Sequence, residues 1–258
     1  MPNFKPRLLS SLLFIGALMT SSCDLINPDE SIPSYVHVKN IAVDTDYATE
    51  GSAQHQISDI WIVHNGNIVA TTPIPSTVPI LQANDKNEIR LYAGIKEGGT
   101  STNRTIYPFF NFVTHPMSFI PEQLDTLDKS SLIFSYKETT KFVWMEDFEN
   151  STMSIQPIDK NSAPIQLTKK KSEVKEGKAS FLVELNSKDS LMSVQGFSFF
   201  EGTEFNLGSP TYLELSYRNE VNLQIGLSYR SADNVIQYAP PILYLKESPD
   251  EWKTVYVN

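Results

Sequence analysis

Apolar and polar residues alternate with a period of two along most of the chain after residue 34, which is typical of half-buried strands. In the stretch 87–94, for example, Ile89 and Leu91 alternate with Arg90 and Tyr92. No window of helical length carries a 3.6-residue period, so we predict almost no helix there. The predicted strands are 35–43, 57–64, 67–71, 87–94, 104–113, 132–136, 143–149, 179–185, 192–200, 211–217, 223–229, 235–239 and 252–257.

A two-residue turn at Asn65-Gly66 is expected to join the second and third of these strands. Both central residues of a type I′ turn need positive φ, which asparagine and glycine adopt readily. Pro73, Pro75 and Pro79 follow. Because proline lacks the N–H that a central strand donates, we expect this stretch to cross an edge or turn a corner.

The spacing of the predicted strands, about 8–12 residues, is typical of β-sandwiches. We therefore predict an all-β chain with two β-sandwich domains in tandem, at residues 35–140 and 141–258, behind a lipoprotein signal peptide at 1–22. Residues 23–34 are polar and contain Pro28 and Pro33. A polar segment with prolines is expected to be a tether rather than a first strand.

The N-terminus has the order of an export signal. Lys5 and Arg7 precede the apolar run 8–19, and small residues lead to Cys23. The run is shorter than the roughly 20 residues that span a bilayer. The order resembles a bacterial lipoprotein signal, which implies cleavage before Cys23, lipid on its sulfur and attachment to the outer membrane, on its periplasmic or outer side. An ordinary secretory signal with an incidental cysteine is the alternative.

Charge and cysteine content exclude several classes of function. The 258 residues carry 21 basic and 30 acidic side chains, a net charge of −9. This balance argues against nucleic acid as a partner and against electrostatic docking to anionic lipid headgroups. Cys23 is the only cysteine. Once it is lipidated, the chain has no disulfide, thiolate chemistry or cysteine metal site.

Several segments together resemble a family of uncharacterised Bacteroidetes-type lipoproteins. They are Ile57–Val63, Asn65-Gly66, Pro79–Leu81, Tyr92–Lys96, Gly98 and Ile106–Phe109, with Trp144–Glu149 resembling the segment that opens the C-terminal domain. The resemblance implies no established activity. The first domain, with its hairpin before Thr72-Pro73, is also similar to PEGA-like and transthyretin-like sandwiches. The second resembles a galactose-binding-type jelly roll, which usually continues past residues 252–257. We therefore expect it to be C-terminally incomplete, with one edge open.

No catalytic motif is present in the sequence. Neither a phosphate-binding glycine loop nor a nucleophile elbow occurs, and the four histidines lack metal-ligand spacing. In the strand predicted at 143–149, Glu146 and Asp147 would point to opposite faces, whereas Asp147 and Glu149 would share one. The jelly-roll resemblance implies a structural Ca²⁺ at Asp147 and Glu149, with carbonyls from Glu176–Lys178. A solvent-facing acidic strand end is the alternative.

Aromatic residues in the second half offer a surface for stacking on sugars, because a ring face matches the apolar face of a sugar. They are Tyr217, Tyr229, Tyr238, Tyr244 and Trp252. Alternating strands bury half of what they carry, so a role in the core is the competing interpretation. Thr126 and Ser190 each follow an aspartate and precede a leucine, which resembles the acceptor of Bacteroidetes-type O-glycosylation.

These observations predict a non-enzymatic cell-envelope lipoprotein that binds a glycan or a protein. The alternatives are a structural subunit of an envelope assembly and an accessory glycan hydrolase. The lack of any active-site motif makes the hydrolase the weakest of the three hypotheses.

Overall fold

The computed structural model describes residues 31–82, 87–196 and 208–258. They form an all-β fold, as predicted. The described helices are one turn at α3 (Tyr47–Glu50) and the short 3₁₀ helix η1 (Lys171–Glu173). None of the helices in this part of the chain combines the length and the apolar character needed to cross a membrane. The predicted signal peptide and Cys23 lie outside the described residues.

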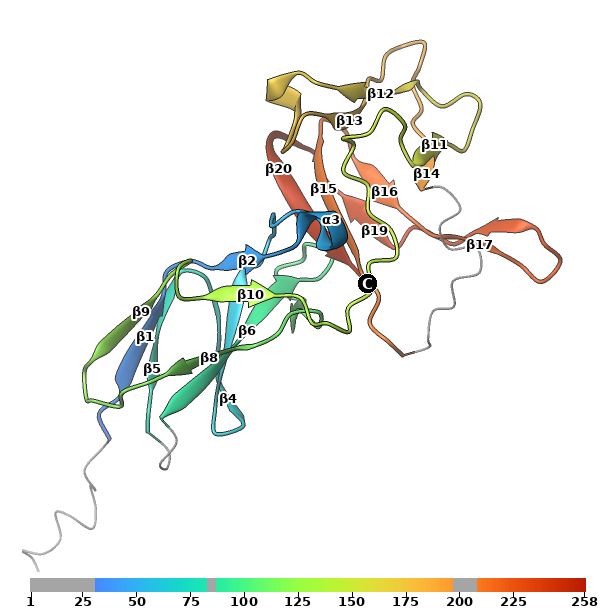
Figure 1. The fold of residues 1–258 in the computed structure, drawn as a ribbon. Coiled ribbons are helices and arrows are strands. Elements are labelled where there is room, and N and C mark those ends of the chain that lie inside the picture. The colour runs from blue at the N-terminus through green and yellow to red at the C-terminus, as the bar shows by residue number, and fades with distance from the viewer. Residues whose placement is uncertain (1–30, 83–86, 197–207) are drawn as a thin grey trace, which may run out of the picture.

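Two facing sheets build the N-terminal region, residues 34–140 (Figure 1). In the larger sheet β3 pairs with β4 and β6, and β6 also pairs with β7 and β8. In the smaller sheet β1 lies between β5 and β9. A third, parallel pair joins β2 to β10. The bounds are β1 Ser34–Val38, β2 Ala42–Asp44, β3 Asp59–His64, β4 Asn67–Pro73, β5 Ser76–Ile80, β6 Glu88–Lys96, β7 Arg104–Ile106, β8 Val113–Pro116, β9 Leu124–Leu127 and β10 Ile133–Ser135.

Local sequence explains most of this region. Asn65 and Gly66 have φ of 52° and 79°, which confirms the turn between β3 and β4. Of the three prolines, Pro73 ends β4, Pro75 lies in the connection, and Pro79 lies in the edge strand β5, opposite Tyr35. The single strand predicted at 104–113 is divided into β7 and β8, because Tyr107 and Phe110 turn inward between them and are buried.

The C-terminal region, residues 141–258, consists of two-stranded antiparallel pairs among its described residues. A jelly roll has larger sheets, which do not appear in this pairing. The jelly-roll fold expected for this region therefore stays a prediction. The pairs are β11 (Ile155–Pro157) with β14 (Val194–Gly196), β12 (Ile165–Thr168) with β13 (Ser180–Val183), β15 (Leu213–Asn219) with β20 (Ser248–Val257), β16 (Leu223–Ile225) with β19 (Leu243–Leu245), and β17 (Ser228–Arg230) with β18 (Ile236–Tyr238).

The prediction of a strand at 143–149 is wrong, because these residues form a loop. The Glu146 carboxylate accepts the Phe148 N–H at 2.9 Å, and Asp147 accepts the Glu149 N–H at 3.1 Å. Phe148 has a φ of 62°, which extended backbone does not adopt. Local side chains thus take the backbone donors that a strand ladder would use, and the segment forms a loop.

Strand β20 contributes to two hydrophobic clusters at once. Val255 and Val257 pack with Leu245 in a cluster of the C-terminal region. Tyr256, on the opposite face of the strand, is buried in the large cluster of the N-terminal region. Its ring lies 5.1 Å from that of Tyr107, measured between centroids. One strand therefore joins the two regions through its alternation.

Hydrogen bonds reinforce the seam around Tyr256. Its carbonyl accepts the Gly98 N–H at 2.7 Å, and its hydroxyl accepts the Gln56 N–H at 3.0 Å. Beside it on β15, the Glu214 carboxylate accepts hydrogen bonds from the hydroxyls of Tyr107 and Tyr136. Desolvation raises the pKa of Glu214, and these two bonds act against that rise.

Candidate functional site

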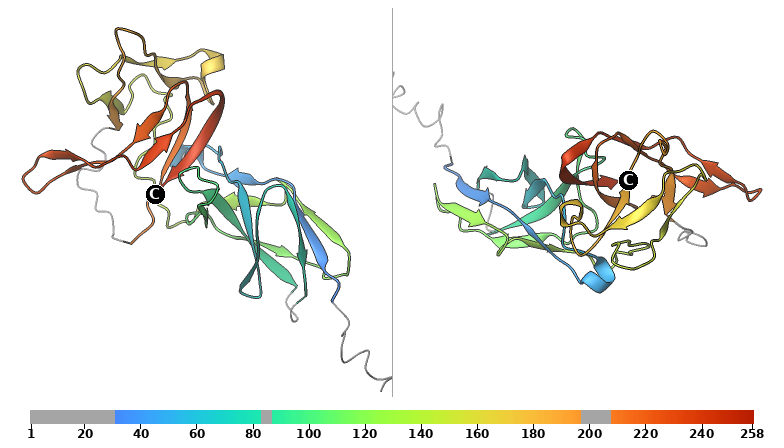
Figure 2. Two further views of the ribbon diagram at one scale, coloured as in Figure 1. Left: turned by 180° about the vertical axis from the view of Figure 1, so that it is seen from behind. Right: turned by 90° about the horizontal axis from the view of Figure 1, so that it is seen from above.

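The strands β16, β17, β18 and β19 together form one long antiparallel ribbon. Its two halves are linked by hydrogen bonds from the Ile242 N–H to the Ile225 carbonyl and from the Ala239 N–H to the Leu227 carbonyl, both 2.8 Å. Figures 1 and 2 show the half made by β17 and β18 projecting away from the rest of the molecule. We call residues 226–239, which contain β17 and β18, the projecting hairpin.

The base of this ribbon is fixed to the protein, and its tip is a closed turn. Leu223, Ile225 and Leu243 pack against the cluster of the C-terminal region. At the tip, the Ser231 N–H donates to the Val235 carbonyl at 2.9 Å, and the Ser231 hydroxyl donates to Asp233 at 2.6 Å. The hairpin is therefore held at one end and ordered by its own hydrogen bonds at the other.

Large apolar side chains of the projecting hairpin lie open to solvent on both of its faces. Tyr229 pairs with Gln237, and Tyr238 pairs with Ser228, so the two tyrosines point to opposite faces. Each is 58% exposed. Exposed aliphatic residues accompany them, namely Leu227, Val235 and Ile236. Large exposed apolar side chains gathered on one element in this way favour an interaction site.

The aromatic residues singled out in the sequence divide into two groups. Tyr229, Tyr238 and Tyr244 are exposed on the ribbon, and Tyr244 is the most open at 66%. Tyr217 packs against the cluster of the C-terminal region instead. Trp252 is half-buried, with the guanidinium of Arg218 5.5 Å from its ring centre. The structure thus places three of the five on the ribbon, with Tyr229 and Tyr238 on opposite faces of it.

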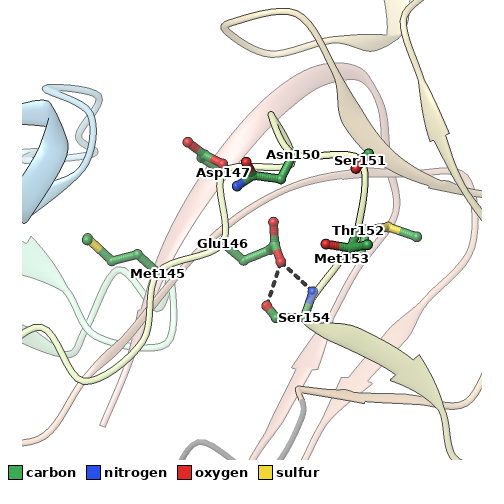
Figure 3. A pocket seen from close by; sticks show the side chains of 8 residues that line it. All are labelled: Met145, Glu146, Asp147, Asn150, Ser151, Thr152, Met153 and Ser154. Carbon is green, nitrogen blue, oxygen red and sulfur yellow. Dashed lines mark hydrogen bonds between the residues drawn. The ribbon is translucent and has the colours of Figure 1, made fainter.

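The acidic loop that opens the C-terminal region is held together by its own hydrogen bonds (Figure 3). Glu146 accepts both the N–H and the hydroxyl of Ser154. The loop surrounds an open depression of about 370 Å³, lined by Met145–Asp147 and Asn150–Ser154.

The two carboxylates predicted to bind calcium each have protein donors. Asp147 accepts the hydroxyl of Tyr47 at 3.0 Å, and burial together with this bond raises the pKa of Tyr47. Glu149 accepts the N–H groups of Lys178 and Ala179 at 2.6 and 3.2 Å. No group of three or more His, Cys, Asp or Glu side chains suited to a metal occurs among the described residues. Asp147 and Glu149 therefore brace the loop here.

Both residues predicted as O-glycosylation acceptors are accessible. Thr126 is exposed on β9, an edge strand of the smaller sheet. Ser190 is exposed in the loop between β13 and β14. Their positions meet the steric requirement for modification, which stays a prediction.

Comparisons with models of protein families, with curated proteins and with solved structures find no match to this chain. The interpretation of its surface therefore rests on the chemistry of its own residues.

Proposed function

We propose that this chain is a non-enzymatic lipoprotein of the cell envelope, anchored through Cys23, that binds a glycan on its ribbon. In this proposal residues 35–140 and 141–258 are two β-sandwich domains in tandem, the second of jelly-roll type. The separate hydrophobic clusters of the two regions support the division. The order of the N-terminal residues supports the anchor.

The observation that carries the proposal is the exposure of Tyr229, Tyr238 and Tyr244 on one ribbon. Tyrosine offers a rigid ring face for a sugar and a hydroxyl for hydrogen bonding. The exposed amides of Gln224 and Gln237 lie opposite Tyr244 and Tyr229 in the strand register. Each pairing places a hydrogen-bonding group for sugar hydroxyls beside a stacking surface.

A glycan array probed with the full-length protein tests this proposal. Tyr229→Ala and Tyr238→Ala are each expected to weaken binding to the glycans that the wild-type protein retains. Tyr47→Ala is the matched control, because Tyr47 is also an exposed tyrosine, at 54%, but lies on α3. Equal loss in the control, or no glycan binding by the wild-type protein, contradicts a glycan platform.

The anchor has a test of its own. Cys23→Ala is expected to move the protein from the detergent phase to the soluble fraction, since membrane attachment depends on the lipid chains at that sulfur. Retention of the variant in the membrane contradicts the lipoprotein assignment.

A structural subunit of an envelope assembly is the second candidate. The aliphatic side chains of Leu227, Val235 and Ile236 favour it, because exposed aliphatic groups add little to sugar stacking but suit a protein interface. A photo-crosslinking residue at position 227 in intact cells distinguishes the two. A single discrete adduct that Ile236→Ser abolishes, without any change in glycan binding, favours the subunit.

A further inference from the structure

We propose that Lys175, Ser216 and Thr254 form a binding site for a small oxyanion, such as a phosphate or carboxylate group, at the seam between the two regions. The site is distinct from the ribbon tyrosines and does not depend on the proposed glycan binding.

The centre of the site is an ammonium group bound to two hydroxyls. Lys175 Nζ lies 2.5 Å from the Ser216 hydroxyl and 2.9 Å from the Thr254 hydroxyl. These hydroxyls lie 2.9 Å from each other, on paired residues of β15 and β20. The two strands therefore present both hydroxyls on one face, and Lys175 reaches them from the loop that follows η1.

The positive charge of Lys175 has no carboxylate partner within ion-pair distance among the described residues. The side chain is half-buried, and this burial lowers the pKa of Lys175; the charge of Glu176 acts against the fall. A half-buried ammonium that has only neutral acceptors is incompletely compensated. An anion would supply the missing charge.

A count of hydrogens shows what the cluster can still bind. The ammonium has three hydrogens and donates two of them to the hydroxyls. The bond between Ser216 and Thr254 uses one of the two hydroxyl hydrogens. One ammonium hydrogen and one hydroxyl hydrogen remain without an acceptor among the described residues. Two donors beside one positive charge match an oxyanion, which offers several acceptor oxygens.

Thermal unfolding of the full-length protein in detergent tests the site, with inorganic phosphate compared with chloride at equal ionic strength. Phosphate should raise the unfolding midpoint of the wild-type protein, because a ligand that binds only the folded state stabilises it. Lys175→Met should weaken the apparent phosphate affinity roughly tenfold or more, since it removes a charge-assisted bond. A parallel titration with acetate separates a site for phosphate alone from one for carboxylates as well.

Two further variants make the result decisive. Lys253→Met, on β20 but paired with Glu251 at 3.3 Å, should keep the full phosphate response. Ser216→Ala removes an exposed hydroxyl and preserves the ammonium, and it should also weaken the response. This variant keeps the test available if Lys175→Met fails to fold. The proposal is overturned if the wild-type protein shows no response to phosphate. It is also overturned if Lys175→Met and Ser216→Ala both respond as strongly as the wild-type protein.

Discussion

The two regions of this molecule bury very different amounts of apolar surface. Among the described residues, the large cluster contains nineteen buried side chains, and all but Tyr256 come from the N-terminal region. The cluster of the C-terminal region has three, namely Leu245, Val255 and Val257. Because burial of apolar area is the main favourable term in folding, the N-terminal region is the stable scaffold of the pair.

The difference assigns separate roles to the two regions. A region with little core of its own gains stability by packing against a neighbour, and here the buried Tyr256 and the partly buried Tyr212 pack into the cluster of the N-terminal region. The ribbon lies in the weaker region, and its projecting hairpin has no buried residue among those whose burial is described. The surface proposed to bind a glycan thus extends from a region that the seam holds to the scaffold.

Removing the tyrosine that crosses the seam should have the largest effect. Tyr256→Ala is expected to cost about 3–5 kcal/mol, the range for truncating a buried aromatic ring. The loss should appear in urea unfolding of the full chain. Tyr217→Ala truncates a half-buried ring of the smaller cluster and should cost less. A larger loss from Tyr217→Ala contradicts the view that the seam dominates.

A buried ion pair in the N-terminal region provides a second test of the comparison between the two regions. Asp59 is fully buried on β3 and pairs with Arg104, and it also accepts the Ser58 hydroxyl at 2.6 Å. Arg104→Met should cost about 3 kcal/mol, because an unpaired carboxylate is left in the core. The double variant with Asp59→Asn should recover part of that loss. Denaturant midpoints of the three proteins measure both effects.

A smaller effect is expected at the loop that opens the C-terminal region. Gly177 has a φ of 67°, and a Cβ there would meet the carboxylate of Glu149. Gly177→Ala should therefore cost about 2 kcal/mol, from backbone strain plus displacement of Glu149. Gly66→Ala is the matched control, with a φ of 79° but open space around it, and should cost about 1 kcal/mol. Equal thermal shifts would show that the contact with Glu149 contributes nothing.

Local patterns predicted much of the fold. The alternation in β6 and the Asn65-Gly66 turn appear as expected, because neighbouring residues decide both. The prediction of a strand at 143–149 was wrong because Glu146 and Asp147 accept hydrogen bonds from nearby backbone N–H groups. A period-two pattern does not reveal such bonds. The edge strand β5 was missed because Pro79 within it and Pro75 just before it suppress the strand signal, although an edge tolerates proline.

The candidate site was predictable only in part. Alternation places Tyr217 and Tyr229 on strands, but it does not tell which face meets a neighbouring element. The role of Tyr256 did leave a signal. Val255, Tyr256 and Val257 are three consecutive apolar residues, which breaks the alternation of a half-buried strand and places apolar side chains on both faces. The contacts of Lys175 left no signal in the sequence, because its partners are distant along the chain and are brought together by the pairing of β15 with β20.

Hydrogen exchange of the full-length protein, resolved by segment with mass spectrometry, tests the central claim most directly. The claim is that the end of β20 belongs energetically to the N-terminal scaffold, whereas the projecting hairpin does not. The account predicts that residues 254–257 are protected as strongly as β3 and β6, and that β17 and β18 exchange fastest among the paired strands. Exchange of residues 254–257 at the rate of the projecting hairpin would contradict it.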